Sequence, residues 1–369
     1  MKRISIVILL ILMIFSGCSS NPAETEEPSE RPTVSPVAPP VATTTRPSPT
    51  PTPEPTSEPF RNPLNGAPLE EDISMQRPYA VMINNVSPAL PHCGVSAADI
   101  IYEVLAEGGV TRMMVVFSDL SEAGVLGSIR SVRPYYLEIA RSYDAIVIHA
   151  GGSVPFSYDK IRDAGMDTID GVNGRYGEGT AFYRDVNRMA YGTEHSLFTT
   201  SDLMAEYTGI LEYRTEHEDE IDYGLTFSEE ETSAEKGSDA ANIQIRFAGY
   251  KTSDFLYNED EGVYYMTQYS QKYIDGNTQQ AVDFTNVMVI AASTAPTGDE
   301  YARIDVSLSG SGDGYFANGG KIVPIKWQRA GDGATFTYTT TDGKPLVSGV
   351  GRTFIAVIPN EDLSGFSYS

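Results

Sequence analysis

The chain of 369 residues is poor in cysteine, in basic side chains and in long apolar runs. Its two cysteines, Cys18 and Cys93, are too few for a disulfide framework or a cysteine-based metal cage. Its 26 lysines and arginines stand against 50 acidic residues, which gives a formal net charge of −24. Because such a negative molecule repels phosphate, nucleic acid is not expected as a partner. The one long apolar run, from Ile4 to Phe15, is too short to span a bilayer comfortably.

The N-terminus has the order of parts typical of a secretory signal. A basic start at Met1-Lys2-Arg3 is followed by the apolar run, and Ser16-Gly17 places two small residues before Cys18. This resembles a lipobox, with Phe15 where leucine is usual, and the cysteine of a lipobox becomes the lipidated first residue of the mature protein. We therefore predict a signal peptide over residues 1–17, lipid on Cys18 and an extracytoplasmic location at the cell membrane. An ordinary secreted protein with a chance cysteine is the alternative.

Residues 18–59 contain almost no large apolar side chain, and 12 of the 23 prolines lie in this segment. Such a composition cannot form a core, and proline favours extended polyproline II geometry. We predict a disordered linker that acts as a stalk and, at roughly 3 Å per residue, reaches on the order of 100 Å when extended. It would hold the folded part within reach of the cell wall.

Strand and helix patterns alternate after residue 60. Apolar runs predict strands and helical spacing predicts helices; the strands are 79–83, 112–117 and 145–150, and the helices are 97–106, 131–142, 155–164 and 197–207. We therefore predict an N-terminal layered α/β sandwich domain over residues 60–235. Acidic residues between 216 and 231 lack the spacing of a calcium-binding loop, so we interpret them as a hydrated connector.

Beyond the connector, short β-branched and aromatic runs alternate with Gly, Asp and Asn. Asp342-Gly343 is a hairpin signal between two such runs. The predicted strands are 242–247, 263–269, 284–291, 302–308, 321–327, 335–340 and 353–358. We predict a smaller β-rich C-terminal domain over residues 236–369, and a mixed α+β fold for the whole chain.

Arginine is concentrated in the first domain, with eight arginines and one lysine between Arg112 and Arg188. The guanidinium fork suits bidentate recognition of carboxylate or phosphate. Arg130 and Arg133 lie at the start of the predicted helix 131–142, where free backbone N–H groups also favour an anion. The alternative is that these arginines pair with nearby carboxylates, as most surface ion pairs do.

A second feature is His149-Ala150-Gly151-Gly152-Ser153, which follows a predicted strand. It places His149 at the carboxyl end of that strand, where ligands tend to bind in open α/β sheets. The segment lacks the ending of a phosphate loop, and Pro155 stands where a nucleophile elbow needs glycine. His149 as a ligand or proton-transfer group and His149 as a buried structural side chain are both open interpretations.

A third feature is Phe182-Tyr183-Arg184-Asp185, followed by Arg188 and Glu194-His195-Ser196. Arg184 and Arg188 would face one site if this segment were helical. His149, His195 and Asp185 match no short metal motif, so neither a metal nor a cofactor is predicted. The candidate ligand-binding residues are Arg112, Arg130, Arg133, His149, Ser153, Arg184 and His195.

Several stretches together resemble the YerB-like lipoprotein family. They are Arg77 to Asn85, Glu107 to Arg112, Gly127 to Tyr135, His149 to Ser153, Phe182 to Asp185, Gly320 to Trp327 and Asp342 to Lys344. The resemblance implies a lipid-anchored envelope protein with a layered α/β domain followed by a smaller β-rich domain. The family is one of unknown function, so it transfers no catalytic residue. Glu194-His195-Ser196 departs from the Pro-His-Asn expected there.

Two functions of different class are open at this stage, and whether the protein is an enzyme is undecided. The first is a binding module whose Arg/His cleft takes an anionic envelope ligand or a partner protein. Peptidoglycan stem carboxylates, teichoic-acid phosphates and a wall-synthesis enzyme are the candidates. The second is a wall-active hydrolase or transferase with His149 as base, in which Arg130 and Arg133 stabilise negative charge.

Overall fold

The computed structural model describes residues 59–369, apart from the side chains of residues 361–363. The predicted signal peptide, Cys18 and the stalk up to residue 58 lie outside the described residues. Among the described residues, no helix is both long enough and apolar enough to cross a membrane.

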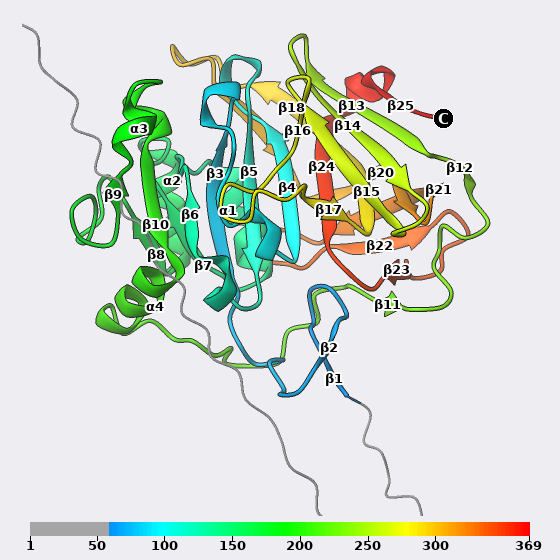
Figure 1. Ribbon diagram of the computed structural model, residues 1–369, viewed down its shortest axis with the longest axis horizontal. Coiled ribbons are helices and arrows are strands. Elements are labelled where there is room, and N and C mark those ends of the chain that lie inside the picture. The colour runs from blue at the N-terminus through cyan, green and yellow to red at the C-terminus, as the bar shows by residue number, and fades with distance from the viewer. Residues whose placement is uncertain (1–58) are drawn as a thin grey trace, which may run out of the picture. The chain divides into compact units, whose positions relative to one another are not determined.

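A twelve-stranded sheet runs through the described part of the chain (Figure 1). Its strand order is β12-β21-β20-β18-β24-β4-β5-β3-β7-β8, with β19 beside β18 and β22 beside β21. The strands of its first half along the chain are β3 (Tyr79–Asn85), β4 (Ile100–Leu105), β5 (Thr111–Phe117), β7 (Ile146–His149) and β8 (Thr168–Asp170). The others are β12 (Ser238–Asp239), β18 (Asn286–Pro296), β19 (Ile304–Ser307), β20 (Gly310–Asn318), β21 (Lys321–Arg329), β22 (Thr337–Thr340) and β24 (Thr353–Pro359).

A six-stranded sheet forms a second layer. Its order is β16-β15-β14-β13-β25, with β17 beside β15. These strands are β13 (Asn242–Ala248), β14 (Lys251–Asn258), β15 (Val263–Gln268), β16 (Gln271–Lys272), β17 (Asp283–Phe284) and β25 (Phe366–Tyr368). A three-stranded sheet consists of β6 (Val125–Gly127), β10 (Leu197–Thr200) and β9 (Tyr183–Arg184). Two further sheets have two strands each: β1 (Phe60–Arg61) pairs with β2 (Pro68–Leu69), and β11 (Phe227–Ser228) pairs with β23 (Ser348–Gly349).

Short helices complete the fold. The α-helices are α1 (Pro134–Ser142), α2 (Phe156–Ala164), α3 (Val186–Met189) and α4 (Ser201–Ile210). The 3-10 helices are η1 (Ser87–Ala89), η2 (Val95–Ala97), η3 (Glu107–Gly109), η4 (Ser121–Ala123), η5 (Thr193–His195) and η6 (Asn360–Gly365).

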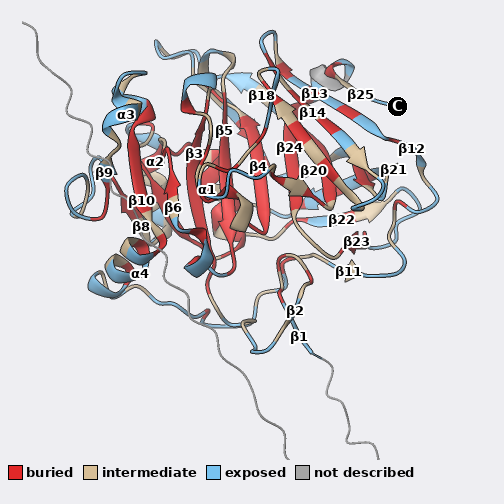
Figure 2. Ribbon diagram, in the orientation of Figure 1, coloured by how far each residue is buried: buried red, intermediate tan, exposed pale blue. Residues whose placement is uncertain are grey.

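The central strands of the large sheet, such as β3 and β5, are buried on both faces, as Figure 2 shows. On one face, α1 residues such as Tyr136 and Ile139 pack against Met114 of β5. On the other face, the six-stranded sheet packs against β4, β18 and β24, with Phe255 of β14 against Phe354 of β24. Burial of this apolar area on both faces is the main stabilising contribution to such a layered fold.

Most of the predicted elements are confirmed. The strands 79–83, 112–117 and 145–150 correspond to β3, β5 and β7. The helices 131–142 and 155–164 correspond to α1 and α2, and Pro134 occupies the first turn of α1 as expected. The 197–207 segment is β10 followed by α4, whose N-cap Thr200 accepts a hydrogen bond from the Leu203 N–H.

The helix predicted over residues 97–106 is wrong, because this segment contains β4. Ile100, Ile101, Val104 and Leu105 match helical spacing, but the strand lies in the middle of the large sheet. A strand buried on both faces loses the alternation that identifies strands, and its apolar run is then ambiguous. The fold is mixed and contains more strand than helix, so the expected α/β sandwich is only partly right.

The two expected domains contribute to one sheet. β24 pairs in parallel with β4, so strands from both expected domains lie next to each other in the large sheet. All described residues, 59–369, also group in one compact unit. The boundary between residues 235 and 236 stays a prediction.

A buried polar network lies where the second sheet packs on the first. The Lys251 ammonium lies 2.9 Å from a Glu103 carboxylate oxygen, and both side chains are fully buried. Lys251 also donates to Gln268 at 2.7 Å, and Glu103 accepts from Asn85 at 2.8 Å. A buried ion pair of this kind is tolerable only when hydrogen bonds satisfy its remaining polar atoms.

Candidate functional site

The candidate site lies where β3 and β7 end. The segment of residues 128–132 runs between these two strands: the Arg130 N–H donates to the Met82 carbonyl at 2.9 Å, and the Ala150 N–H donates to the Arg130 carbonyl at 3.0 Å. The segment then leads through Arg133, the N-cap of α1, into that helix. It therefore brings Arg130 and Arg133 to the carboxyl ends of parallel strands and to a helix N-terminus, both of which favour anions.

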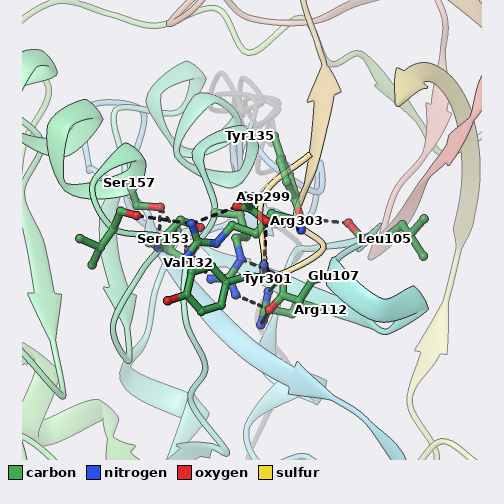
Figure 3. A network of polar contacts seen from close by, with 12 residues as sticks. Leu105, Glu107, Arg112, Val132, Tyr135, Ser153, Ser157, Asp299, Tyr301 and Arg303 are labelled. Carbon is green, nitrogen blue, oxygen red and sulfur yellow. Dashed lines mark hydrogen bonds and ion pairs between the residues drawn. The ribbon is translucent and has the colours of Figure 1, made fainter. Parts of the chain in front are cut away.

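Arg112 and Arg133 share one carboxylate, that of Glu107. Figure 3 shows Arg112 beside Glu107. The Arg112 guanidinium donates to Glu107 at 2.5 and 3.1 Å, and Arg133 donates to it through two nitrogens, one of them at 2.9 Å. Burial opposes ionisation of Glu107, but the hydrogen bonds from the two arginines outweigh it and hold the pKa of its carboxyl well below the usual range. The sequence left open whether the arginines pair with nearby carboxylates, and Arg112 and Arg133 do so.

Arg130 differs from both neighbours. Within residues 59–369, its guanidinium has no carboxylate at ion-pair distance and no protein hydrogen-bond acceptor, although the side chain is half-buried. Burial and the nearby charge of Arg112 lower the pKa of Arg130. The guanidinium groups of Arg112, Arg130 and Arg133 thus lie near Glu107, and Glu194 acts on Arg130 from beyond ion-pair distance. Three cations against these two carboxylates leave an excess of positive charge in an otherwise acidic protein.

Arg130 lines a pocket of about 290 Å³ together with Arg184. The other lining residues are Ile129, Ala150, Val172, Thr193, Glu194 and Leu197. Arg184 holds the wall of this pocket, because it donates to Glu178 at 2.8 Å and to the Thr193 carbonyl at 2.6 Å. Of the seven predicted site residues, Arg130 and Arg184 therefore line this pocket together.

His149 and Ser153 do not reach this pocket. The His149 ring is fully buried, with Nδ1 2.9 Å from the Gly151 carbonyl oxygen and 3.9 Å from Asp170 Oδ2. Burial lowers its pKa, although Asp170 acts in the opposite direction. His149 Nε2 and Ser153 Oγ are buried and have no hydrogen-bond partner among the described residues. Neither side chain can meet a ligand from solvent in this structure.

His195 lies beside the pocket but is 8% exposed. The Asn84 side-chain amide donates to His195 Nδ1 at 2.8 Å, which fixes the ring. The idea that Arg184 and Arg188 share a helical face is wrong, because Arg184 lies in β9 and Arg188 in α3. The Arg188 guanidinium instead donates to the carbonyls of Leu90 and Pro91.

The sequence did not identify every residue of the site. Glu107, the partner of Arg112 and Arg133, stands in the sequence only within the family-like stretch Glu107 to Arg112, and Val172 of the pocket carries no signal. Glu194 belongs to the Glu194-His195-Ser196 stretch without being one of the predicted site residues, and Thr193 directly precedes that stretch. In the part of the chain that the structure describes, no group of three His, Cys, Asp or Glu side chains could hold a metal ion.

Two family models match the chain over these regions. The "Protein of unknown function (DUF3048) N-terminal domain" covers residues 64–214, and the corresponding C-terminal domain covers residues 243–355. The chain belongs to the DUF3048 family. The Bacillus subtilis (strain 168) family member named "Putative lipoprotein YerB" is 27% identical over 310 residues, or 83% of this chain and 88% of the relative. The crystal structure of Bacillus subtilis YerB matches with a TM-score of 0.73 at 25% identity, over 84% of this chain and 99% of that chain.

Proposed function

We propose that this DUF3048 protein is a membrane-anchored extracytoplasmic lipoprotein whose folded part binds an anionic envelope ligand in the pocket beside Arg130. The anchoring is supported by the signal-like N-terminus that ends at Cys18, and by the Bacillus subtilis relative, which is named as a lipoprotein. Lipid on Cys18 would hold the protein on the membrane without a spanning helix.

The observation that carries the binding proposal is the guanidinium of Arg130. An arginine that lines a pocket and meets no carboxylate keeps its donors available for a carboxylate or a phosphate. Arg112 adds positive charge nearby, and its own carboxylate partner, Glu107, is shared with Arg133. Peptidoglycan stem carboxylates, teichoic-acid phosphates and an acidic surface of a wall-synthesis enzyme are all anions of the required kind.

The hydrolase alternative, with His149 as general base, receives no support. A general base must come within hydrogen-bond distance of the proton that it removes. The buried His149 imidazole has no route to a substrate in the pocket, so the proposed site consists of Arg130 with the surrounding wall and leaves out His149 and Ser153.

The test is co-sedimentation of the purified full chain with isolated cell wall. We expect Arg130→Gln to weaken retention about tenfold, the usual effect of losing one hydrogen bond to a charged group. Arg162→Gln is the matched control, since Arg162 is an exposed arginine of α2 that pairs with Asp159 and Asp163. Wall stripped of its phosphate polymers distinguishes phosphate from carboxylate ligands. Equal retention of the Arg130→Gln and wild-type proteins would refute the site.

A further inference from the structure

The chemistry of the pocket wall narrows the ligand class further. We propose that the pocket binds a zwitterion, in which a carboxylate meets Arg130 and a neighbouring ammonium group meets Glu194. A free amino acid, or an amino-acid end group on a branched peptide, has this arrangement of charges. The inference rests on the proposed function, because it assigns the anionic half of the ligand to Arg130.

Arg130 and Glu194 both line the pocket without forming an ion pair with each other. Among the described residues, the one ion-pair contact of the Glu194 carboxylate is to His195 Nε2, at 3.8 Å. His195 gives little compensation, because burial favours its neutral form. The Glu194 side chain is 49% exposed, so its carboxylate is accessible. Within residues 59–369, the pocket therefore presents one cation and one anion, neither of which has a Lys, Arg, Asp or Glu partner at ion-pair distance.

This pair of charges discriminates between ligand classes. A phosphate dianion placed against Arg130 would be repelled by Glu194, and a simple amine placed against Glu194 would be repelled by Arg130. A ligand with both charges avoids either repulsion and gains two charge-assisted hydrogen bonds. Arg184 does not alter this balance, because its guanidinium is already occupied by Glu178 and by the Thr193 carbonyl.

The rest of the wall is apolar. Ile129, Ala150 and Leu197 are buried beneath the pocket, and Val172 is 56% exposed at its edge. Such a surface suits an aliphatic portion of the ligand next to the charged groups, since an apolar contact excludes water from them. The volume of about 290 Å³ has room for a group of amino-acid size.

The experiment titrates the purified full chain with four probes and follows binding by NMR chemical-shift changes. The probes are leucine, N-acetyl-leucine, leucine amide and inorganic phosphate. We expect leucine to bind about tenfold more tightly than either capped form, because each cap removes one charge-assisted hydrogen bond. Leucine should also bind more tightly than phosphate.

Two variants separate this inference from the proposed function. Glu194→Gln should abolish the preference for leucine over N-acetyl-leucine while binding of the acetylated anion persists. Arg130→Gln should weaken binding of both. If wild type binds N-acetyl-leucine or phosphate as tightly as leucine, and Arg130→Gln removes that binding, the zwitterion is refuted and the anion site stands. If no probe binds wild type while retention on cell wall still depends on Arg130, the zwitterion inference alone fails; if Arg130→Gln also leaves that retention unchanged, the proposed function fails as well.

Discussion

The buried pair of Lys251 and Glu103 allows the packing of the two sheets to be tested. Glu103 belongs to β4, in the N-terminal family segment, and Lys251 belongs to β14, in the C-terminal one. Both side chains are fully buried at 2.9 Å separation. Lys251→Met would keep most of the side-chain volume but leave the Glu103 carboxylate buried without its cation.

The expected loss is large. Removing one partner of a buried ion pair typically costs about 3–5 kcal/mol, because an uncompensated charge remains in the interior. Hydrogen bonds from Asn85, Thr111 and Ser253 would still reach Glu103, which places the expected loss toward the lower end of that range. For a folded part of this size, a loss of about 3 kcal/mol corresponds to a fall in Tm of roughly 4–5 °C.

The assay is urea unfolding of wild type, Lys251→Met, Glu103→Gln and the double variant. The double variant should lose less than the sum of the single losses, by about 1 kcal/mol or more, since the neutral amide removes the uncompensated charge. Lys344→Met is the control, because Lys344 forms an exposed pair with Asp342 and should leave the midpoint unchanged. A loss under about 1 kcal/mol for Lys251→Met, or strict additivity, would refute the reasoning.

Three further predictions concern the arginine cluster, the buried histidines and the anchor. Glu107→Gln should lower the free energy of unfolding by about 3 kcal/mol in urea titration, because Arg112 and Arg133 lose their shared counter-ion. Burial lowers the pKa of His92 from 6.5 to about 3, so below pH 6.5 the unfolded chain binds a proton that the folded chain does not. The contribution of His92 to the free energy of unfolding should therefore fall by about 1.4 kcal/mol for each pH unit below 6.5. The His92→Gln variant should lose this contribution, so its plot of unfolding free energy against pH should be flatter between pH 6.5 and 5 than that of wild type. Cys18→Ala should move the protein from the membrane to the soluble fraction on cell fractionation, and retention on the membrane would contradict lipid anchoring.

Sequence patterns predicted most of the elements whose burial is one-sided or whose ends carry clear signals. They failed for β4, which is buried on both faces, and they missed β20, whose glycines are typical of a turn. A Cβ atom at Gly312 would lie 2.4 Å from Trp327 Nε1, so this strand uses glycine to let the tryptophan ring lie against it. That requirement comes from a cross-strand neighbour and cannot be read from the local sequence.

In the candidate site, too, local sequence signals were predictive and contacts between distant residues were not. The concentration of arginine predicted a positive region, and the sequence also raised the alternative of pairing with carboxylates. Which arginine is paired depends on Glu107, which three-dimensional packing brings to Arg133 from 26 positions away. The burial of His149 could not be predicted from the sequence either. Its ring lies against the Gly151 carbonyl, which belongs to the glycine segment that directly follows it.

The arginine cluster depends on both family segments. The Tyr250 hydroxyl, in the C-terminal segment, donates to the Gly108 carbonyl at 2.7 Å and so holds the turn that carries Glu107. Arg303 of the same segment donates to the Val154 carbonyl at 3.4 Å, next to the loop that buries Ser153 (Figure 3). Because Glu107 pairs with Arg112 and Arg133 but not with Arg130, contacts from the C-terminal segment help to determine which guanidinium is left for a ligand. The candidate site is therefore a property of the whole folded unit, which gives a physical reason for the two segments to occur together in one chain.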